Sequence, residues 1–466
     1  MSEDRPELVV AGAGGGLVAA LRAAQLGLEV LVVEASPHYR RGNNTSMSTA
    51  MVPGAGSRWQ REAGITDSPD QFVADVARKT KGEADLRVAR ALAEVSARLV
   101  EWMADDLGIP LQLVTDFHYP GHSVDRCHTV EGRHGSVLLG HLVRKVRESD
   151  RITMLVPARL VDVHVDDAGC TAVIAQPDGR AEHVETGAVL LATNGYGGDP
   201  ELVARHLPEI ARAVYHGSET SRGDALRIGE RLGAATAFLD AYQGHAALAK
   251  RGATLVGWAT VMHGGFLVDR KGRRFGDETT GYSEYAAQLA AQDGAEGWLI
   301  LDQRIHDACL AFTDFRQTVE SGALVWADTL EQLARAIGVD ARALAEECAA
   351  LAGVAGRAGA DRFGRTSVEA PLRAPFAAVR VVPALFHTQG GLVVDGHARV
   401  LRPDGDPIPG LYASGGAAEG ISGHGAAGYL AGNGLLPALG LAFLAAEHIA
   451  STGACSDHPT SQKEDT

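Results

Sequence analysis

The sequence predicts an α/β fold, in which a discontinuous Rossmann-like domain holds an inserted α+β domain. Three observations lead to this prediction. Residues 7–36 begin the chain as a strand, a glycine-rich turn, a helix and a second strand. Glycine-rich strand, loop and helix patterns return near the C-terminus, over 387–401 and 410–420. Between these parts, residues 240–370 have a more mixed pattern, typical of an insertion.

The chain length of 466 residues is ample for a large core and favours two or three domains. We expect the Rossmann-like domain over 1–238 and 371–452 and a capping or substrate domain over 239–370. The remaining residues, 453–466, are expected to form a disordered tail.

The composition is that of a soluble globular protein, with 45% hydrophobic and 22% charged residues. The formal net charge of −15 argues against nucleic acid and anionic membranes as partners. Five cysteines are scattered without a CxxC pair, and the acidic N-terminus shows no secretory signal, so we expect a reduced, cytoplasmic setting. The apolar segment 435–450 is too short and too interrupted to span a bilayer, which predicts a buried helix and no membrane insertion.

The first 30 residues of the pattern have the order of a dinucleotide-binding βαβ unit. Gly12, Gly14, Gly15 and Gly16 follow the first strand, and the acidic Glu34 ends the second. Because glycines lack side chains, the turn can approach a pyrophosphate, and the helix directs its N-terminal N–H groups at that charge. Glu34 would accept hydrogen bonds from a ribose. The sequence therefore predicts a bound dinucleotide.

The register of the glycine fingerprint stays open. Counting from Gly12 leaves Leu17 where the third glycine should stand. Counting from Ala11 leaves alanines at the first two positions and Gly16 at the third. Either register departs from the strict pattern, so the sequence does not decide which backbone amides face the phosphates.

The following segments extend the α/β pattern. A polar loop, 40–54, precedes a segment with apolar residues at helical spacing, 85–108. Residues 152–179 alternate and turn like an antiparallel meander. A buried strand that ends in glycines, 187–202, is followed by another helix, 221–236.

With these blocks in order, the chain resembles the flavoprotein family of soluble fumarate reductases, tricarballylate dehydrogenases and 3-ketosteroid dehydrogenases. The resemblance covers about residues 7–450. It rests on the βαβ start and on the motifs GNNTSMST, LLATNGYGG, SRGDALRIGERLGA, GRRFGDE, HTQGGLVVD and PIPGLYASGG. The resemblance implies that the dinucleotide is FAD, bound by the Rossmann-like domain.

By this resemblance, the FAD contacts several loops besides the glycine turn. The cofactor residues that it implies outside the turn are Glu34, Asn43, Asn44, Thr45, Ser46, Ala192, Thr193, Asn194, Gly195, Asp224, Gly415, Gly416, Asn433, Gly434, Leu435 and Leu436. The loop 42–46 holds no histidine, where respiratory relatives attach their flavin covalently. We therefore expect FAD that is bound non-covalently.

The residues after GRRFGDE set the chain apart from the fumarate reductases that it resembles. In those enzymes an arginine at this place donates a proton, and a second arginine near the C-terminal helix binds a carboxylate. Here the two positions hold Gly281 and Tyr429. The acid and the arginine that relay protons in fumarate reductases fall on Trp258 and Val261. We therefore do not expect fumarate as the substrate.

Ketosteroid dehydrogenases carry tyrosines at two matching places, which are Tyr282 and Tyr429 in this chain. Forming a C=C bond beside a ketone requires removal of an α-proton and transfer of a hydride from the β-carbon to flavin N5. Tyr282 is the candidate base, and Tyr429 is the candidate hydrogen-bond donor to the carbonyl. Ala377 departs from the steroid enzymes, which commonly have a tyrosine there.

Three further side chains are candidate catalytic or substrate-contacting residues. His245 and His387 match histidines of the fumarate reductase site, and Tyr119 would line the substrate mouth. Each also has an ordinary alternative as a packing or hydrogen-bonded residue. Segment 118–141 holds five histidines, but their spacings match no ligand motif, so we expect no metal site. The charges of GRRFGDE are expected to form a structural ion-pair cluster.

The leading interpretation is an FAD-dependent oxidoreductase acting on CH–CH bonds. It would remove hydrogens α,β to the carbonyl of a largely apolar, small-molecule ketone such as a 3-ketosteroid, and pass the electrons to an external acceptor that the sequence does not indicate. Two alternatives stay open. One is an FAD-dependent dehydrogenase or ene-reductase of a small organic acid, similar to fumarate reductase or tricarballylate dehydrogenase. The other is a catalytically silent flavin-binding protein.

Overall fold

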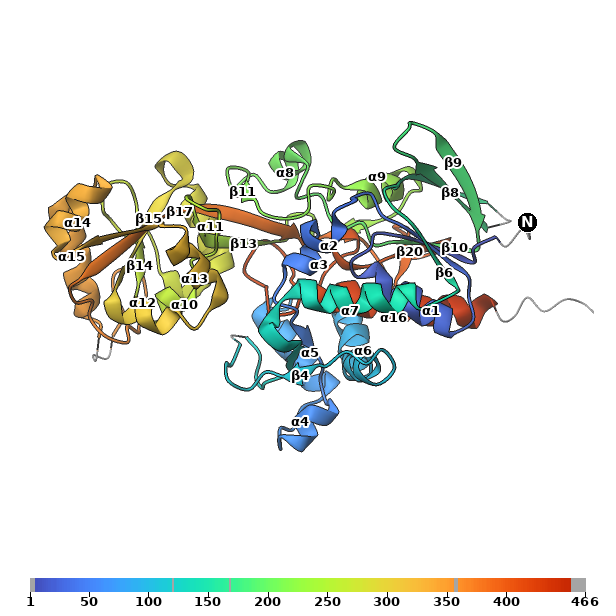
Figure 1. Ribbon diagram of the computed structural model, residues 1–466, viewed down its shortest axis with the longest axis horizontal. Helices are drawn as coiled ribbons and strands as arrows, with labels where there is room; N and C mark the ends of the chain where they lie inside the picture. The colour runs from blue at the N-terminus through green and yellow to red at the C-terminus, as the bar shows by residue number, and fades with distance from the viewer. Residues whose placement is uncertain (1–4, 120, 167–168, 356–358, 454–466) are drawn as a thin grey trace, which may run out of the picture. The chain divides into compact units, whose positions relative to one another are not determined.

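The chain divides into two compact units, each with its own sheet (Figure 1). The computed structural model describes residues 5–119, 121–166, 169–355 and 359–453. The first unit takes in Met1–Asp199, Gly217–Ala241 and His387–Thr466, and the second takes in Pro200–His216 and Tyr242–Phe386.

These units do not test where the predicted functional domains begin and end. The domain bounds of 1–238 with 371–452, and of 239–370, therefore stay predictions. The predicted tail, 453–466, lies outside the described residues except for Gly453, which is the last residue of helix α16 (Leu435–Gly453).

A six-stranded, mostly parallel sheet forms the centre of the first unit. Its strand order is β19-β20-β10-β1-β2-β6, and only β19 pairs antiparallel to its neighbour. The strands are β1 (Leu8–Ala11), β2 (Val30–Val33), β6 (Ile152–Leu155), β10 (Ala188–Leu191), β19 (Arg399–Leu401) and β20 (Pro407–Ala413). The strands β1 and β10 are continuous apolar runs buried at every residue, as parallel strands covered on both faces require.

Strand β6 differs from the sequence expectation. Residues 152–179 were expected to form one antiparallel meander, but Val30 to Val33 pair in parallel with Ile152 to Leu155. Only the later part of the segment is a meander, made by β7 (Arg159–Asp166), β8 (Gly169–Ala175) and β9 (Ala181–Thr186). Strand β6 is parallel because it pairs with β2, which lies more than 100 residues earlier in the chain, and a local sequence pattern does not show this partner.

Helices α1, α7 and α16 lie side by side in the first unit (Figure 1). They are α1 (Gly16–Gln25), α7 (Gly135–Arg147) and α16, and α16 also packs against α6 (Leu86–Asp105). The α6 helix begins at Asp85, whose carboxylate accepts hydrogen bonds from the N–H groups of Arg87 and Val88. Its apolar residues recur at helical spacing and face the core.

Helix α16 is longer than the sequence analysis expected. It has 19 residues and is long and apolar enough, by length and composition alone, to cross a membrane. Most of its apolar surface is buried inside the protein, against α1 and α6. The expectation of a buried helix is therefore confirmed, whereas the argument that the segment is too short was wrong. Burial identifies α16 as a core helix.

Smaller elements complete the first unit. They are α2 (Tyr39–Gly42), α3 (Asn44–Met47), β3 (Val52–Pro53), α4 (Arg58–Glu62), α5 (Pro69–Lys79), β4 (Gln112–Leu113), β5 (Cys127–Thr129), α9 (Asp224–Arg231), β12 (Thr236–Ala237) and β18 (Gly391–Leu392). Strands β3, β5 and β4 form a small antiparallel sheet of their own.

The second unit is built on the long strand β17 (Phe376–Thr388), whose last two residues belong to the first unit. Strands β11, β13, β15 and β16 all pair with β17, and β14 pairs with β15. Their bounds are β11 (Val214–Tyr215), β13 (Tyr242–Ala249), β14 (Phe266–Val268), β15 (Gly297–Asp302) and β16 (Leu324–Ala327). The helices of this unit are α8 (Pro200–His206), α10 (Ala259–Met262), α11 (Tyr282–Ala290), α12 (Gln303–Cys309), α13 (Thr313–Glu320), α14 (Leu330–Ile337) and α15 (Ala341–Ala352). The α/β class with an α+β insertion is thus confirmed.

Candidate active site

The glycine turn between β1 and α1 is built for close approach of backbone. Gly12 has φ +113°, and a Cβ there would lie 2.3 Å from the carbonyl oxygen of Ala192. A Cβ at Gly16 would lie 2.6 Å from Cγ1 of Val10, so the helix can pack on the strand only because this residue is glycine. Close packing of helix on strand is the role of the third glycine in the fingerprint. The structure therefore favours the register that starts at Ala11.

The other two glycines bring neighbouring elements onto the turn. A Cβ at Gly15 would lie 2.6 Å from the carbonyl oxygen of Ala438 in α16. A Cβ at Gly14 would lie 2.9 Å from Oγ1 of Thr45 in α3. The first N–H groups of a helix have no intrahelical acceptor, so the start of α1 presents donors to a negatively charged group.

Glu34 is buried and braces the turn. Its Oε2 accepts a hydrogen bond from the N–H of Ala13 at 2.8 Å, and its Oε1 accepts one from the N–H of Ser36 at 2.7 Å. Burial raises the pKa of Glu34, although these hydrogen bonds act in the opposite direction. Each oxygen can accept further hydrogen bonds, so the predicted contact with a ribose stays a prediction.

The loop 43–46 is hydrogen-bonded to the same glycine turn. The Asn43 side chain accepts from the N–H of Ser46 at 2.8 Å, and thereby caps α3, while its Nδ2 donates to the carbonyl of Ala13 at 3.4 Å. Asn44 accepts a hydrogen bond from the N–H of Ser218 at 2.8 Å. This loop therefore lies beside the glycines, as its predicted cofactor role requires.

The loops that follow β10 and β20 hold buried polar atoms without partners. Within the described part of the chain, no hydrogen-bond partner is found for Thr193 Oγ1, Ser414 Oγ or Asn433 Oδ1. Neither amide atom of Gln389 has one either. Burying an unpaired polar group is costly, and in open α/β sheets ligands bind beyond the carboxyl ends of the strands. These atoms therefore fit a large polar ligand such as FAD.

Of these four residues, the sequence analysis did not name Gln389 or Ser414 individually, although Ser414 lies in the loop LYASGG, whose glycines were expected to contact FAD. A signal was available, since each is a polar side chain in an otherwise apolar or glycine-rich segment. The glycines expected in these loops are closely approached by neighbouring side chains. A Cβ at Gly416 would lie 2.4 Å from the side chain of Asn194, and a Cβ at Gly195 would overlap Oγ1 of Thr388.

Asp224 has a structural partner. Its carboxylate forms an ion pair with Arg159 at 2.7 Å, at the first turn of α9. Leu435 and Leu436 are buried apolar residues at the start of α16, where they can offer only their backbone to a ligand. Thus the cofactor roles expected of Asp224 and of the two leucines stay predictions.

His387 and Gly434 are close neighbours in the first unit. A Cβ at Gly434 would lie 3.1 Å from Nε2 of His387. The Nδ1 of His387 donates to the carbonyl oxygen of Thr388 at 3.2 Å, and burial lowers its pKa to about 4. The imidazole is therefore neutral at physiological pH. Tyr429 is half-buried in the glycine-rich loop that leads to α16.

Tyr119 is half-buried. It lies against a small apolar cluster of Met51, Val114 and Cys127, together with Ala431. Burial raises the pKa of Tyr119 to about 12. The substrate contact expected of Tyr119 stays a prediction.

Tyr282 belongs to an aromatic cluster in the second unit. It is the first residue of α11 and follows Gly281, whose φ of +130° suits glycine. His245 stacks on Tyr282 with ring centroids 5.0 Å apart, and on Phe386 at 5.6 Å. Trp258 meets His245 edge-on at 6.0 Å. The structure thus brings together two of the predicted site residues, Tyr282 and His245.

The tautomer of His245 is set by the backbone. Its Nδ1 accepts a hydrogen bond from the N–H of Ala247 at 3.1 Å, and burial lowers its pKa to about 3. A neutral imidazole with an accepting Nδ1 carries its proton on Nε2. His245 is therefore a neutral hydrogen-bond donor, not a cation.

The charges of the GRRFGDE segment form a buried ion cluster only in part. Glu278 accepts from Arg274 at 2.7 Å and pairs with Arg365 at 3.2 Å, and all three side chains are buried. Arg273 instead forms a surface pair with Glu346. The ion-pair expectation is thus confirmed for Arg274 and Glu278 and was wrong for Arg273.

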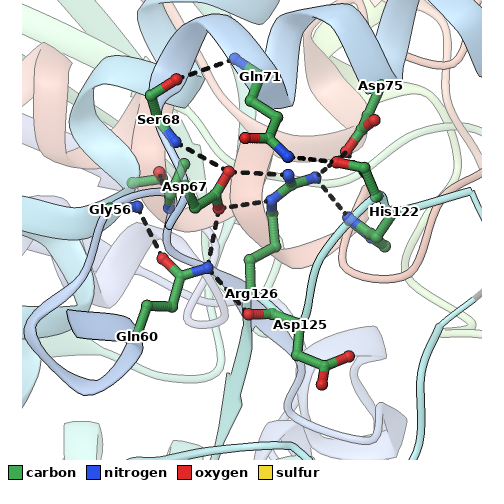
Figure 2. A network of polar contacts seen from close by, with 12 residues as sticks. Gly56, Gln60, Asp67, Ser68, Gln71, Asp75, His122, Asp125 and Arg126 are labelled. Carbon is green, nitrogen blue, oxygen red and sulfur yellow. Dashed lines mark hydrogen bonds and ion pairs between the residues drawn. The ribbon is translucent and has the colours of Figure 1, made fainter. Parts of the chain in front are cut away.

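The histidine-rich segment 118–141 contributes to a polar network around Arg126 (Figure 2). The guanidinium binds both oxygens of Asp67 at 2.9 and 3.0 Å, and donates to Asp75 and to Nδ1 of His122. The pKa of His122 is lowered to about 4, first by burial and then by Arg126. Among the described residues, no group of three or more His, Cys, Asp or Glu side chains could hold a metal ion.

The sheet topology, the glycine turn and the polar loops together define a dinucleotide-binding flavoprotein. The chain belongs to the FAD binding domain family, whose model matches residues 7–435. FAD is therefore the cofactor, as predicted.

Curated relatives cover most of this chain. The NADH:fumarate oxidoreductase of Klebsiella pneumoniae (strain 342) is 28% identical over 425 residues, which are 90% of this chain and 45% of that protein. The cytochrome-type fumarate reductase of Shewanella frigidimarina is 28% identical and matches 96% of this chain and 77% of its own length. The 4-oxocyclohexanecarboxylate 2-dehydrogenase of Sinomonas cyclohexanicum is 27% identical, over 97% of this chain and 94% of that protein. This chain thus spans less than half the length of the Klebsiella pneumoniae protein.

Two solved structures have the same fold. The open conformation of a flavocytochrome c3 fumarate reductase matches with a TM-score of 0.83 and 27% identity, over 96% of this chain and 78% of that chain. The 3-ketosteroid delta1-dehydrogenase from Sterolibacterium denitrificans, in complex with 1,4-androstadiene-3,17-dione, matches with a TM-score of 0.79 and 23% identity, over 96% and 100%. The chain is therefore an FAD-dependent oxidoreductase with fumarate reductases among its relatives, and it shares its fold with a 3-ketosteroid dehydrogenase.

Proposed function

We propose that this protein desaturates a largely apolar ketone, taking a proton from the α-carbon and a hydride from the β-carbon. Bound FAD supplies the hydride acceptor. Tyr282 removes the α-proton, and Tyr429 donates a hydrogen bond to the carbonyl oxygen, which stabilises enolate character as the proton leaves. His245, with its proton on Nε2, is a second neutral donor on the same aromatic cluster as Tyr282.

The observation that carries this proposal is the aromatic packing around Tyr282 in the second unit, where His245 stacks on Tyr282 and on Phe386. His245 and His387 have pKa values lowered to about 3 and about 4 by burial, so neither offers a positive charge to a carboxylate at physiological pH. The neighbours of His245 are the rings of Tyr282, Phe386 and Trp258. A neutral, aromatic surface favours an apolar ketone over a dicarboxylate, whose desolvation would go uncompensated.

A second candidate function has support from the relatives. Most of the curated relatives reported above are fumarate-type reductases, and one is named for a dehydrogenase of 4-oxocyclohexanecarboxylate, a compound with both a ketone and a carboxylate. A small oxo acid would use the same α,β-desaturation chemistry. The cytoplasmic setting, the non-covalent attachment of FAD and the identity of the electron acceptor remain separate predictions.

Substrate screening tests the proposal. Purified holoprotein should reduce an artificial electron acceptor with ketosteroids or cyclic ketones, and should not oxidise a reduced dye with fumarate. Gly281 supplies no acid, and Trp258 and Val261 supply no proton path, so fumarate reduction has no proton donor. Rapid turnover of fumarate would overturn the proposal, and turnover of oxo acids alone would favour the second candidate.

Tyrosine variants test the assigned roles. Tyr282→Phe should slow flavin reduction by the active substrate about 10²–10⁴-fold, as for loss of a general base, and Tyr429→Phe about 10²–10³-fold, as for loss of one oxyanion donor. Tyr285→Phe is the matched control, because Tyr285 lies on the same helix and its buried hydroxyl has no partner in the described chain. The measurement is anaerobic stopped-flow bleaching of the flavin across pH. A rise of the rate with pH should be absent in Tyr282→Phe and should persist in Tyr429→Phe. Parental rates in both variants would contradict the roles.

A further inference from the structure

Two buried glutamines of the first unit differ in whether their side-chain amides have hydrogen-bond partners. The carboxamide of Gln60 accepts from the N–H groups of Gly56 and Ser57, and it donates to Asp67 and to the carbonyl of Asp125 (Figure 2). The carboxamide of Gln389 is only 4% exposed, and neither its oxygen nor its nitrogen has a partner within the described residues. A buried amide with donor and acceptor both unpaired is costly, so Gln389 requires a partner from outside the chain.

The backbone of Gln389 places this amide among the cofactor loops. Its N–H donates to the carbonyl of Ala241, and its own carbonyl accepts from the N–H of Gly420, each at 2.8 Å. The preceding residue, Thr388, accepts a hydrogen bond from the N–H of Tyr196 at 3.3 Å. Gln389 therefore stands between the loop that follows β10 and the loop that follows β20, where three other polar side chains also have unpaired atoms.

The chemistry of the amide identifies the part of FAD that it suits. A carboxamide presents one accepting oxygen and one donating NH₂ group in a single plane. The pyrimidine ring of a flavin presents the complementary pattern, an N–H donor at N3 between the carbonyl acceptors at C2 and C4. The phosphates and the ribityl hydroxyls offer no such paired edge. The adenine does offer one, but its ribose is predicted at Glu34, after β2, which lies on the opposite side of β1 from β10 and β20. A bidentate contact would satisfy both unpaired atoms of Gln389 at once.

We propose that Gln389 binds the pyrimidine edge of the FAD ring, with its oxygen accepting from N3–H and its nitrogen donating to a neighbouring carbonyl. The reduced ring carries more negative charge on this edge than the oxidised ring, so the donated hydrogen bond stabilises the reduced form more. Gln389 thereby raises the reduction potential of the flavin. This role belongs to the cofactor site and does not depend on which substrate is oxidised.

The test is the variant Gln389→Met, which keeps the length of the side chain and removes both polar atoms. Loss of two hydrogen bonds should raise the dissociation constant for FAD about tenfold or more. The flavin midpoint potential, measured by equilibration with redox dyes, should become more negative, and the visible absorption bands of the bound flavin should shift. A tenfold difference in affinity between reduced and oxidised flavin corresponds to about 30 mV for two electrons.

Gln60→Met is the matched control. It removes an amide whose partners are all in the protein, so it should lower the denaturation midpoint of the holoprotein and leave the FAD dissociation constant and potential unchanged. If Gln389→Met fails to fold, Gln389→Glu keeps the size and the accepting oxygen while lacking the donor, and it should lower the flavin midpoint potential.

Two results would overturn the proposal. A lower denaturation midpoint with unchanged FAD affinity would assign the amide to buried water, and weaker FAD binding without any change of potential or spectrum would exclude the ring edge.

Discussion

Two buried polar regions of the first unit differ in whether the protein satisfies its own polar groups. Around Arg126, every polar group shown in the close-up has a partner: the guanidinium binds Asp67, Asp75 and His122, and Gln60 completes the network (Figure 2). In the loops after β10 and β20, Thr193 Oγ1, Ser414 Oγ and Asn433 Oδ1 are buried but unpaired within the described chain, as are both amide atoms of Gln389 between β17 and β18. The polar groups of the first region are hydrogen-bonded without a ligand, whereas several of those in the second region are not. Several unpaired polar atoms gathered in one buried region thus favour a binding site, whereas a network paired within the protein favours a structural role.

The largest effect is expected from breaking the complete region. In Arg126→Met the carboxylates of Asp67 and Asp75 stay buried without their cation, which typically costs about 3–5 kcal/mol. Urea denaturation of the holoprotein should show this loss, while the flavin content of the molecules that fold stays the same. Arg90→Met is the control, because its pair with Asp70 is exposed to solvent and should contribute little to stability. Equal losses in both variants would contradict the comparison.

An intermediate effect is expected at Glu34, a buried carboxylate that binds the glycine turn. In Glu34→Leu the N–H groups of Ala13 and Ser36 lose their acceptor, and leaving the buried N–H of Ala13 unpaired costs about 1–3 kcal/mol. The glycine turn should lose its shape, and the dissociation constant for FAD should rise tenfold or more, as measured by release of flavin fluorescence. Glu29→Leu, which removes a surface pair with Arg151, should keep the parental affinity. Full flavin occupancy in Glu34→Leu would show that the turn does not depend on this carboxylate.

The smallest effect is expected at Glu419, a buried carboxyl beside the cofactor loops. Burial raises its pKa to about 7, and its Oε1 accepts from the N–H of Val394 at 3.2 Å. Because the folded pKa lies above the unfolded value, the folded protein binds the extra proton. The resulting stability is present below the unfolded pKa and is lost as the pH rises through about 7.

Glu419→Gln should remove this pH dependence, because glutamine keeps an accepting oxygen for Val394 and never ionises. Between pH 5 and pH 8, the stability of the parental protein should fall relative to the variant by on the order of 1 kcal/mol. Thermal denaturation at both pH values measures the difference. Parallel pH profiles for the two proteins would contradict the assignment.

Much of the fold and the cofactor could be predicted because the evidence is local. The βαβ order, Gly16 and the position of Glu34 lie within one short segment, and each is required by backbone geometry. The substrate class could not be predicted from local sequence patterns, because it depends on side chains from several segments that are distant in the sequence.

The sequence by itself determined the α/β class, the FAD-binding family and the candidate tyrosines, because these follow from contiguous motifs. Only the tertiary structure decided that β6 joins the parallel sheet, that Glu34 holds the glycine turn, and that His245 carries its proton on Nε2. It also decided which of the described polar residues lack hydrogen-bond partners. Gln60 and Gln389 are the same residue type and both are buried, but folding places hydrogen-bonding groups around Gln60 and none around Gln389 within the described residues. Hydrogen-bond satisfaction is a property of three-dimensional neighbours, and no pattern along the chain records it.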